Sequence, residues 1–439
     1  MFIEKKQKIF SILFISCWII LWFSINTSPI EEGLLSSLNL IDFSKSIGKS
    51  FGFFRIVLAL LCTYLIILYF IYIFFWQANK INKIYLFIIL TFISQLIGLY
   101  FNQEKTFDVF NSFLAFLSIG TVCLFALCDQ IKVTNILKYF FWASLLILTL
   151  VFITILSFKL PEIKNFDFYS LFSPKDNNIF THDNPRISGL SRTLAILNLF
   201  LILYFFSLKQ YYFKKILLFF SLSISLLLLL MESRGTLLSY FVTLTFITLF
   251  LVQKNTIFKI KYFLILIVFP IVLSISIFNN HTSKESLTKN DKIFNSRIVA
   301  AHSSGRLEIW TYTLKSYDYK KIFGYGPQGD RFFLKETEYI DKGYGNNSSN
   351  ILLYTLLSGG LISIFFWFLV FVEIFKTFIK NRNSFLLNRN NYYLNFSISC
   401  IVFFLVRSII ENSFGLFSID FLMVNLSIVY MLNSLKIKK

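Results

Sequence analysis

The chain has little charge, little proline and very little histidine for its length. Charged residues make up 15% of the 439 positions, and there are only 6 prolines and 3 histidines. Hydrophobic residues reach 56%, a share of apolar surface that a soluble fold cannot bury. The composition therefore excludes an ordinary soluble protein and predicts an all-α polytopic integral membrane protein.

Cysteine and histidine are too sparse and too scattered to form a metal centre or a disulfide framework. The cysteines all lie within or beside apolar segments, without paired ligand spacing: Cys17, Cys62, Cys123, Cys128 and Cys400. The histidines, His182, His281 and His302, stand apart from them. We expect neither a disulfide nor a metal site, and no cofactor is indicated.

The formal net charge of +19 belongs to the loops and not to a nucleic-acid surface. Basic residues stand between long apolar runs instead of clustering on one segment. Lys5, Lys6 and Lys8 precede a first apolar run, and no small-residue cleavage site follows it, so we expect a retained helix there. No nucleic-acid partner is expected.

The apolar runs predict about 12 transmembrane helices, because a span needs roughly 17 to 25 apolar residues. They lie near 9–25, 53–76, 84–101, 109–128, 136–158, 192–208, 213–231, 236–252, 260–278, 350–375, 393–410 and 414–434. We interpret residues 1–439 as a single membrane domain with two long loops, at 159–191 and 279–349. The second loop is expected to carry a short amphipathic helix.

Lysine-rich loops predict the orientation, since basic residues in short loops stay in the cytoplasm. One set of loops is basic and nearly free of acids: Lys80, Lys83, Lys132, Lys138, Lys209, Lys214, Lys215, Lys254, Lys259, Lys261, Lys376, Lys380, Arg382 and Arg389. Both termini belong to this set. We therefore expect a protein of the bacterial inner membrane with both termini cytoplasmic and the two long loops outside.

Arginine, by contrast, concentrates on the predicted outer side. The outward set comprises Arg55, Arg186, Arg192, Arg234, Arg297, Arg306, Arg331 and Arg407. Arginine presents a planar fork that binds phosphate through two hydrogen bonds and stays charged, whereas lysine is a mobile point charge. The partition predicts that the outer ends of the helices bind a lipid-linked phosphate donor.

The outward arginines also have structural interpretations, which the sequence leaves open. Arg186 and Arg192 flank a turn with Gly189, but interfacial anchoring explains them as well. Arg234 follows Glu232 in a very short connection, where the two charges are able to pair. Arg407 and Glu411 stand four positions apart on one helix face, which suits either a functional pair or a clamp.

The large loop contains two further motifs and then leads into a helix. Ser304 and Gly305 predict a helix start, with Arg306 in the first turn, where the helix dipole favours anions. Trp310 lies one turn on, suited to stacking on a sugar ring or to anchoring an interfacial helix. The run 324–331 is a glycine-rich turn that includes Gly326, Asp330 and Arg331. Ser349 and Asn350 then open a helix containing Ser358-Gly359-Gly360, where backbones are able to approach closely.

In this order the motifs resemble the bacterial O-antigen ligase and polymerase superfamily, the WaaL- and Wzy-type enzymes. The matching residues span roughly 180 to 415: Arg186 with Gly189, Ser233-Arg234-Gly235, Gly305-Arg306 with Trp310, Gly324-Tyr325-Gly326-Pro327, Ser349-Asn350 before the Ser-Gly-Gly helix, and Arg407 with Glu411. The resemblance implies a GT-C-like fold and an inverting, metal-independent glycosyltransferase that uses undecaprenyl-pyrophosphate-linked glycans outside the inner membrane. Ligases of the family have a histidine before the late asparagine, and Ser349 stands there, which favours polymerisation of repeat units over ligation to lipid A core.

The expected chemistry requires charge neutralisation at a pyrophosphate leaving group and a base for the acceptor hydroxyl. We expect Arg186, Arg234, Arg306 and Glu411 to be catalytic. Substrate binding is assigned to Arg192, Trp310, Gly326, Arg331, Ser349, Asn350 and Arg407. Candidate bases are Glu232, Asp330, Glu411 and His182, and the sequence does not separate them. The expected partners are the lipid-linked glycan, membrane lipid and a chain-length regulator.

Two other classes of membrane protein fit the same composition. A polysaccharide flippase also has about 12 spans, but its basic residues are expected in the middle of helices and its loops should be short. Here the arginines lie at helix ends, and a long loop interrupts the bundle. A receptor or structural membrane protein would leave the glycine-arginine turns without a role.

Overall fold

The protein is described by a computed structural model in which helices and the turns between them make up all the described residues. These are residues 82–101, 115–116, 118–120, 122, 187–207, 211–230, 234–251, 261–268, 306–319, 321–334, 348–381, 392–415 and 419–437. The helices are α4 (Lys83–Phe101), α9 (Ile187–Ser207), α10 (Tyr211–Leu230), α11 (Arg234–Phe246), α15 (Arg306–Ser316), α16 (Gly329–Leu334), α18 (Ile351–Lys380), α19 (Tyr392–Ile410) and α20 (Ile419–Ile437). Short π-helical segments, η4 (Ile247–Leu251) and η5 (Leu264–Val268), accompany them.

Four of the described helices are long and apolar enough to cross a membrane. They are α4, α18, α19 and the segment Tyr212–Leu229 of α10. A helix suits this role because it satisfies all its backbone hydrogen bonds internally. Buried hydroxyls follow the same rule, since Ser239 donates to the Gly235 carbonyl and Thr243 to the Ser239 carbonyl, each at 2.7 Å. An all-α membrane protein is thus confirmed.

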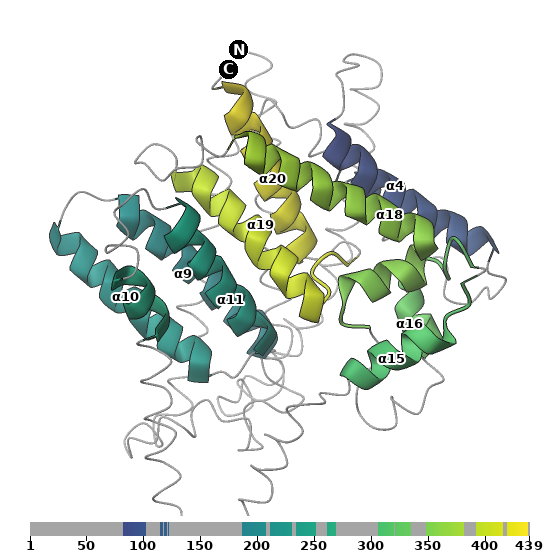
Figure 1. Ribbon diagram of the computed structural model, residues 1–439, viewed down its shortest axis with the longest axis horizontal. Coiled ribbons are helices and arrows are strands. Elements are labelled where there is room, and N and C mark those ends of the chain that lie inside the picture. The colour runs from purple at the N-terminus through teal and green to yellow at the C-terminus, as the bar shows by residue number, and fades with distance from the viewer. Residues whose placement is uncertain are drawn as a thin grey trace, which may run out of the picture.

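The bundle has three neighbouring groups of helices (Figure 1). In Figure 1, α9, α10 and α11 lie on the left, α19 and α20 in the centre, and α4 along α18 on the right. Helix α19 joins the groups, because it packs on α20, α11 and α9. Aromatic side chains fill this contact: the rings of Phe200 and Phe396 meet edge to face with centroids 5.1 Å apart.

A buried polar cluster joins the three helices of the left-hand group. The Asn198 side-chain amide on α9 donates to the Ser221 carbonyl at 2.9 Å and to the Ser225 hydroxyl at 3.0 Å, both on α10. It also reaches the Tyr240 hydroxyl of α11 at 2.6 Å. Hydrogen bonds between apolar helices fix their rotation, because few other partners exist in lipid.

Helix α18 is broken at Gly360, and the glycine-rich turn of the large loop fills the break. Gly360 adopts φ 67° and ψ −162°, a backbone geometry that is open essentially only to glycine. The amides of Tyr325 and Gly326 donate to the carbonyls of Leu357 and Ser358 at 2.7 and 3.0 Å. The loop therefore supplies hydrogen-bond donors to two carbonyls that the break in the helix would leave without a partner.

The loop also packs against α18 and α4 without space for side chains at the glycines of these helices. A β-carbon on Gly360 would lie 1.9 Å from the Ile322 carbonyl oxygen, and one on Gly98 of α4 would lie 2.3 Å from that of Phe323. The Ser-Gly-Gly sequence and the glycine-rich turn are thus two halves of one packing contact.

Most of the described helices coincide with predicted spans, with one difference that matters for the site. The last span was expected at 414–434, but α20 begins at Ile419, because residues 411–415 form a turn in which the Phe414 amide bonds the Asn412 side chain at 3.1 Å. The predicted spans 9–25, 53–76 and 136–158 lie outside the described residues, and only isolated helical positions of 109–128 lie within them. The count of about 12 spans stays a prediction.

Candidate functional site

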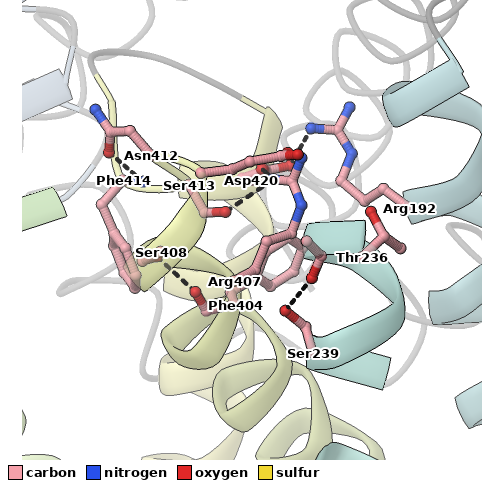
Figure 2. A network of polar contacts seen from close by, with 12 residues as sticks. Arg192, Thr236, Ser239, Phe404, Arg407, Ser408, Asn412, Ser413, Phe414 and Asp420 are labelled. Carbon is pink, nitrogen blue, oxygen red and sulfur yellow. Dashed lines mark hydrogen bonds and ion pairs between the residues drawn. The ribbon is translucent and has the colours of Figure 1, made fainter. Parts of the chain in front are cut away.

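Asp420 joins two buried arginines from different helices (Figure 2). Its Oδ1 atom lies 2.6 Å from Nη1 of Arg192 on α9, and its Oδ2 atom lies 2.5 Å from Nη1 of Arg407 on α19. All three side chains are nearly inaccessible, with exposed fractions of 4% for Asp420, 11% for Arg192 and 5% for Arg407. Each carboxylate oxygen thus holds one guanidinium in a charge-assisted hydrogen bond.

The same network continues outward through Glu411 to Arg306. Arg407 binds Glu411 through Nη2, which confirms the pairing that the spacing of four residues predicts. The other oxygen of Glu411 lies 3.7 Å from Nη2 of Arg306, at the first residue of α15. Arg306 is 33% exposed, so the network runs from a buried end at Asp420 to an accessible end at Arg306.

Local structure explains how these side chains come together. Asp420 lies in the first turn of α20, where the helix dipole favours a carboxylate. Arg407 lies in the last turn of α19, where a cation is favoured, and Ser413 in the following turn accepts from its Nη1 at 2.9 Å. The helix ends that the loop charges predict on the outer side therefore meet at one end of the bundle.

The network carries an excess of positive charge. Arg192, Arg306 and Arg407 contribute three positive charges, and Asp420 and Glu411 contribute two negative charges, which leaves a net charge of +1. Buried ions are tolerated only when they are paired and hydrogen-bonded, and the alternation of signs meets that condition. The longest of these contacts, 3.7 Å between Arg306 and Glu411, lies at the accessible end.

The start of α11 lies against this network. Arg234 is the first residue of α11, and the next residue, Gly235, is in contact with Glu411. The Ser191 hydroxyl on α9 bonds the Thr236 hydroxyl on α11 at 3.4 Å. The backbone at the start of α11 therefore lies beside Glu411.

Residues 348–350 hold the large loop against the bundle. The Trp310 indole on α15 donates to the Ser348 carbonyl at 2.8 Å. Asp330 on α16 accepts from both the amide and the hydroxyl of Ser348 through Oδ2, at 3.1 Å each. Asn350 caps α18 by accepting from the Leu352 amide at 2.8 Å, and its own amide donates to the Ile409 carbonyl at 2.9 Å. This segment thereby fixes α15, and with it Arg306, relative to α19.

Asp330 is buried, and its burial raises the pKa of the carboxyl above the ordinary value, although the Ser348 hydrogen bonds oppose the shift. It is 3% exposed and lies in the loop, outside the predicted spans. Asp330 therefore holds Ser348 in place through two hydrogen bonds and is shielded from solvent.

The predicted site residues fall into four groups. Arg192, Arg306, Arg407 and Glu411 come together in the ionic network. The second group lies where the large loop packs on α18 and α4, a region called the loop contact, and comprises Trp310, Asn350, Ser349 and Gly326. Ser349 is half-buried and has φ 49°. Gly326 has φ 98° and packs on α4, where a β-carbon would lie 2.7 Å from Leu99 Cγ. Arg331 is exposed on α16 and does not join the network. Arg186, Glu232 and His182 lie outside the described residues, and only the backbone of Arg234 is described.

Asp420 is the functional candidate that the sequence reasoning missed. Hydropathy predicts that the last span begins at 414, with Asp420 inside an apolar run. An acid within a span is a functional candidate by default, so the signal was present. No group of three or more His, Cys, Asp or Glu side chains suited to a metal gathers among the residues that the structure describes.

An apolar helix bundle with an ionic network at one end defines an integral membrane protein. Residues 216–368 match the family model described as O-antigen ligase, Wzy_C. The match confirms the resemblance to the O-antigen ligase and polymerase superfamily and supports a membrane function in that family, but it does not distinguish polymerases from ligases. It covers Arg234, Arg306 and the loop contact. Comparison with curated proteins and with solved structures gave no match.

Proposed function

We propose that the protein polymerises undecaprenyl-pyrophosphate-linked oligosaccharide repeat units at the outer face of the inner membrane. The observation that carries this proposal is the arginine network whose accessible end, Arg306, lies within the segment that matches the O-antigen ligase family. Transfer of a growing glycan from its carrier leaves a pyrophosphate, whose developing charge needs fixed positive groups.

Arg306 is the residue best suited to bind the donor pyrophosphate. Its single ionic contact in the network, with Glu411, is long at 3.7 Å, and its side chain is one third exposed. It also begins α15, where free amides and the helix dipole favour an anion. Arg186 and Arg234 are assigned to the same pyrophosphate, with Arg192 and Arg407 in support.

Glu411 is assigned to holding the arginines, because Arg306 and Arg407 both contact its carboxylate. Asp330 is closed to an acceptor by burial and by its bonds to Ser348. Among the candidate bases this leaves Glu232 and His182 for the acceptor hydroxyl. No metal or cofactor enters the proposed reaction.

Polymerisation is favoured over ligation because Ser349 occupies the position of the ligase histidine. Ligation to lipid A core is the second candidate, and the family match is compatible with both. Export by a flippase is less well supported, since the described arginines with known partners lie at helix ends.

The test replaces Arg306 in a cell that makes a long surface glycan. Arg306→Lys keeps the charge but loses the planar fork, and we expect a drop of about tenfold in polymer, with single repeat units accumulating. Lys315→Ala is the matched control, because Lys315 is an exposed basic residue on the same helix. Unchanged chain length in Arg306→Lys and Arg306→Ala would refute polymerisation.

A deletion strain separates the neighbouring functions. Loss of a polymerase leaves single units, loss of a ligase leaves polymer on undecaprenyl pyrophosphate, and loss of a flippase leaves units inside the cell. Orientation is tested by cysteine labelling in intact spheroplasts. We expect an impermeant thiol reagent to modify Asn290→Cys in the predicted outer loop but not Asn255→Cys in a predicted inner loop.

A further inference from the structure

We propose that Asp420 is the positioning residue of the donor site, an inference that rests on the function proposed above. Its carboxylate sets the relative placement of Arg192 and Arg407, and through Arg407 it places Glu411 and Arg306 for the pyrophosphate. Asp420 lies outside the matched segment 216–368. It does not itself reach the accessible end of the network, so its effect on the donor is indirect.

Asp420 has the geometry that such a role requires. One oxygen binds Arg192 of α9 at 2.6 Å and the other binds Arg407 of α19 at 2.5 Å, so a single rigid carboxylate determines the separation of two guanidinium groups. The arginines belong to helices that pack directly on each other. Without the carboxylate between them, two buried like charges would repel.

The effect reaches the accessible end through Arg407. Nη1 of Arg407 is shared by Asp420 and Ser413, while Nη2 binds Glu411. Rotation of this guanidinium to a new partner therefore moves Glu411, whose other oxygen faces Arg306. Each contact in this relay joins atoms that the structure places together.

A positioning role and a simple basic patch predict opposite changes in the affinity for pyrophosphate when Asp420 is replaced by asparagine. Asp420→Asn removes one negative charge and raises the net charge of the network from +1 to +2. If the network attracted pyrophosphate only through its net charge, the variant would bind more tightly. If Asp420 positions the arginines, the variant binds more weakly in spite of its added positive charge.

The experiment measures binding of undecaprenyl pyrophosphate to the purified full-length protein. We expect Asp420→Asn to raise the Kd about tenfold or more and Asp420→Glu to raise it about threefold, because the longer side chain keeps the charge but displaces the carboxylate. Glu373→Gln is the control for loss of one acidic charge, since Glu373 pairs with Lys376 near the other end of α18. Its Kd should equal that of the wild type.

The outcomes separate the inference from the proposed function. Binding by the wild type with equal or tighter binding by Asp420→Asn overturns the positioning role alone. Absence of binding by the wild type overturns the donor site and the inference with it. If Asp420→Asn does not fold, Asp420→Glu decides: a weaker complex supports positioning, and an unchanged Kd overturns it, because the net charge is the same.

Discussion

Glu411 lies against the backbone of Gly235, so that a β-carbon on Gly235 would stand 3.1 Å from Oε1 of Glu411. This contact brings the first turn of α11 next to the carboxylate that links Arg306 and Arg407. A glycine at this position lets the helix backbone approach the network closely. The Ser-Arg-Gly motif therefore has a steric explanation in addition to the charge of its arginine.

Gly235→Ala is expected to reduce polymer formation severalfold while leaving the fold intact. The new methyl group must displace Glu411 by a few tenths of an ångström, whereas alanine in a helix is favoured over glycine by about 0.5 to 1 kcal/mol. Polymer length in cells and thermal unfolding of the purified protein separate the two effects. Gly415→Ala is the control, since its nearest neighbour would lie 3.5 Å away, and equal activity of both variants would contradict the steric role.

Substitutions of Trp310 distinguish an anchor from a platform for sugar stacking. Trp310→Phe loses the hydrogen bond to the Ser348 carbonyl and should cost about 1 kcal/mol of stability. Trp310→Ala also loses packing against the cluster of Leu353, Leu356 and Leu357 and should cost roughly 2 to 3 kcal/mol. Thermal unfolding measures both. A Trp310→Ala protein of normal stability but without activity would instead support stacking on substrate.

Asp330→Asn is expected to change how stability depends on pH. Burial raises the pKa of Asp330 in the folded protein, so its contribution to stability is complete below the ordinary value of about 4 and is lost as pH rises through the raised pKa. Asparagine stays neutral and still accepts from Ser348. The stability of the variant relative to the wild type should therefore increase with pH.

Unfolding midpoints of purified protein between about pH 4 and pH 8 measure this difference. Glu308→Gln, an exposed acid in the first turn of α15, is the control and should show no such trend. Parallel curves for Asp330→Asn and the wild type would contradict the raised pKa.

Gly360→Ala is expected to destabilise the protein by about 3 kcal/mol or more. The residue has φ 67°, and a β-carbon would lie 1.9 Å from the Ile322 carbonyl oxygen, so both backbone strain and overlap oppose the substitution. Expression level and the unfolding midpoint report the loss. Leu361→Ala, which shortens an exposed neighbour, should behave nearly as the wild type does.

The sequence predicts the fold well where a single local rule governs it. Hydropathy placed α4, α10, α18 and α19 within a few residues of their observed bounds, apart from the end of α18, because length and apolarity alone define a span. The helix start at Arg306 followed from Ser304 and Gly305, and α15 begins there. The kink at Gly360 was not predicted, since it depends on hydrogen bonds to a turn that is distant in the sequence.

The site was predicted in its parts but not in its connections. The spacing of Arg407 and Glu411 indicated their pairing. Contacts between Arg192 and Asp420, or between Arg306 and Glu411, join residues that only the packing of the helices brings together, and one sequence holds no signal for them. Asp420 was missed because hydropathy averages over a window, so one acid at a helix start disappears among its apolar neighbours.

The exchange of hydrogen bonds at the break in α18 also limits how the site is able to move. Lifting the glycine-rich turn together with the preceding Ile322 would remove the hydrogen-bond partners of Leu357, Ser358 and Ile362 at once, at a place where no solvent replaces them readily. The turn is therefore a rigid part of the site and does not open as a lid for each substrate. Under the proposed function, the donor glycan would therefore approach from the side of Arg306, the accessible end of the network, over a surface that keeps its shape from one addition to the next.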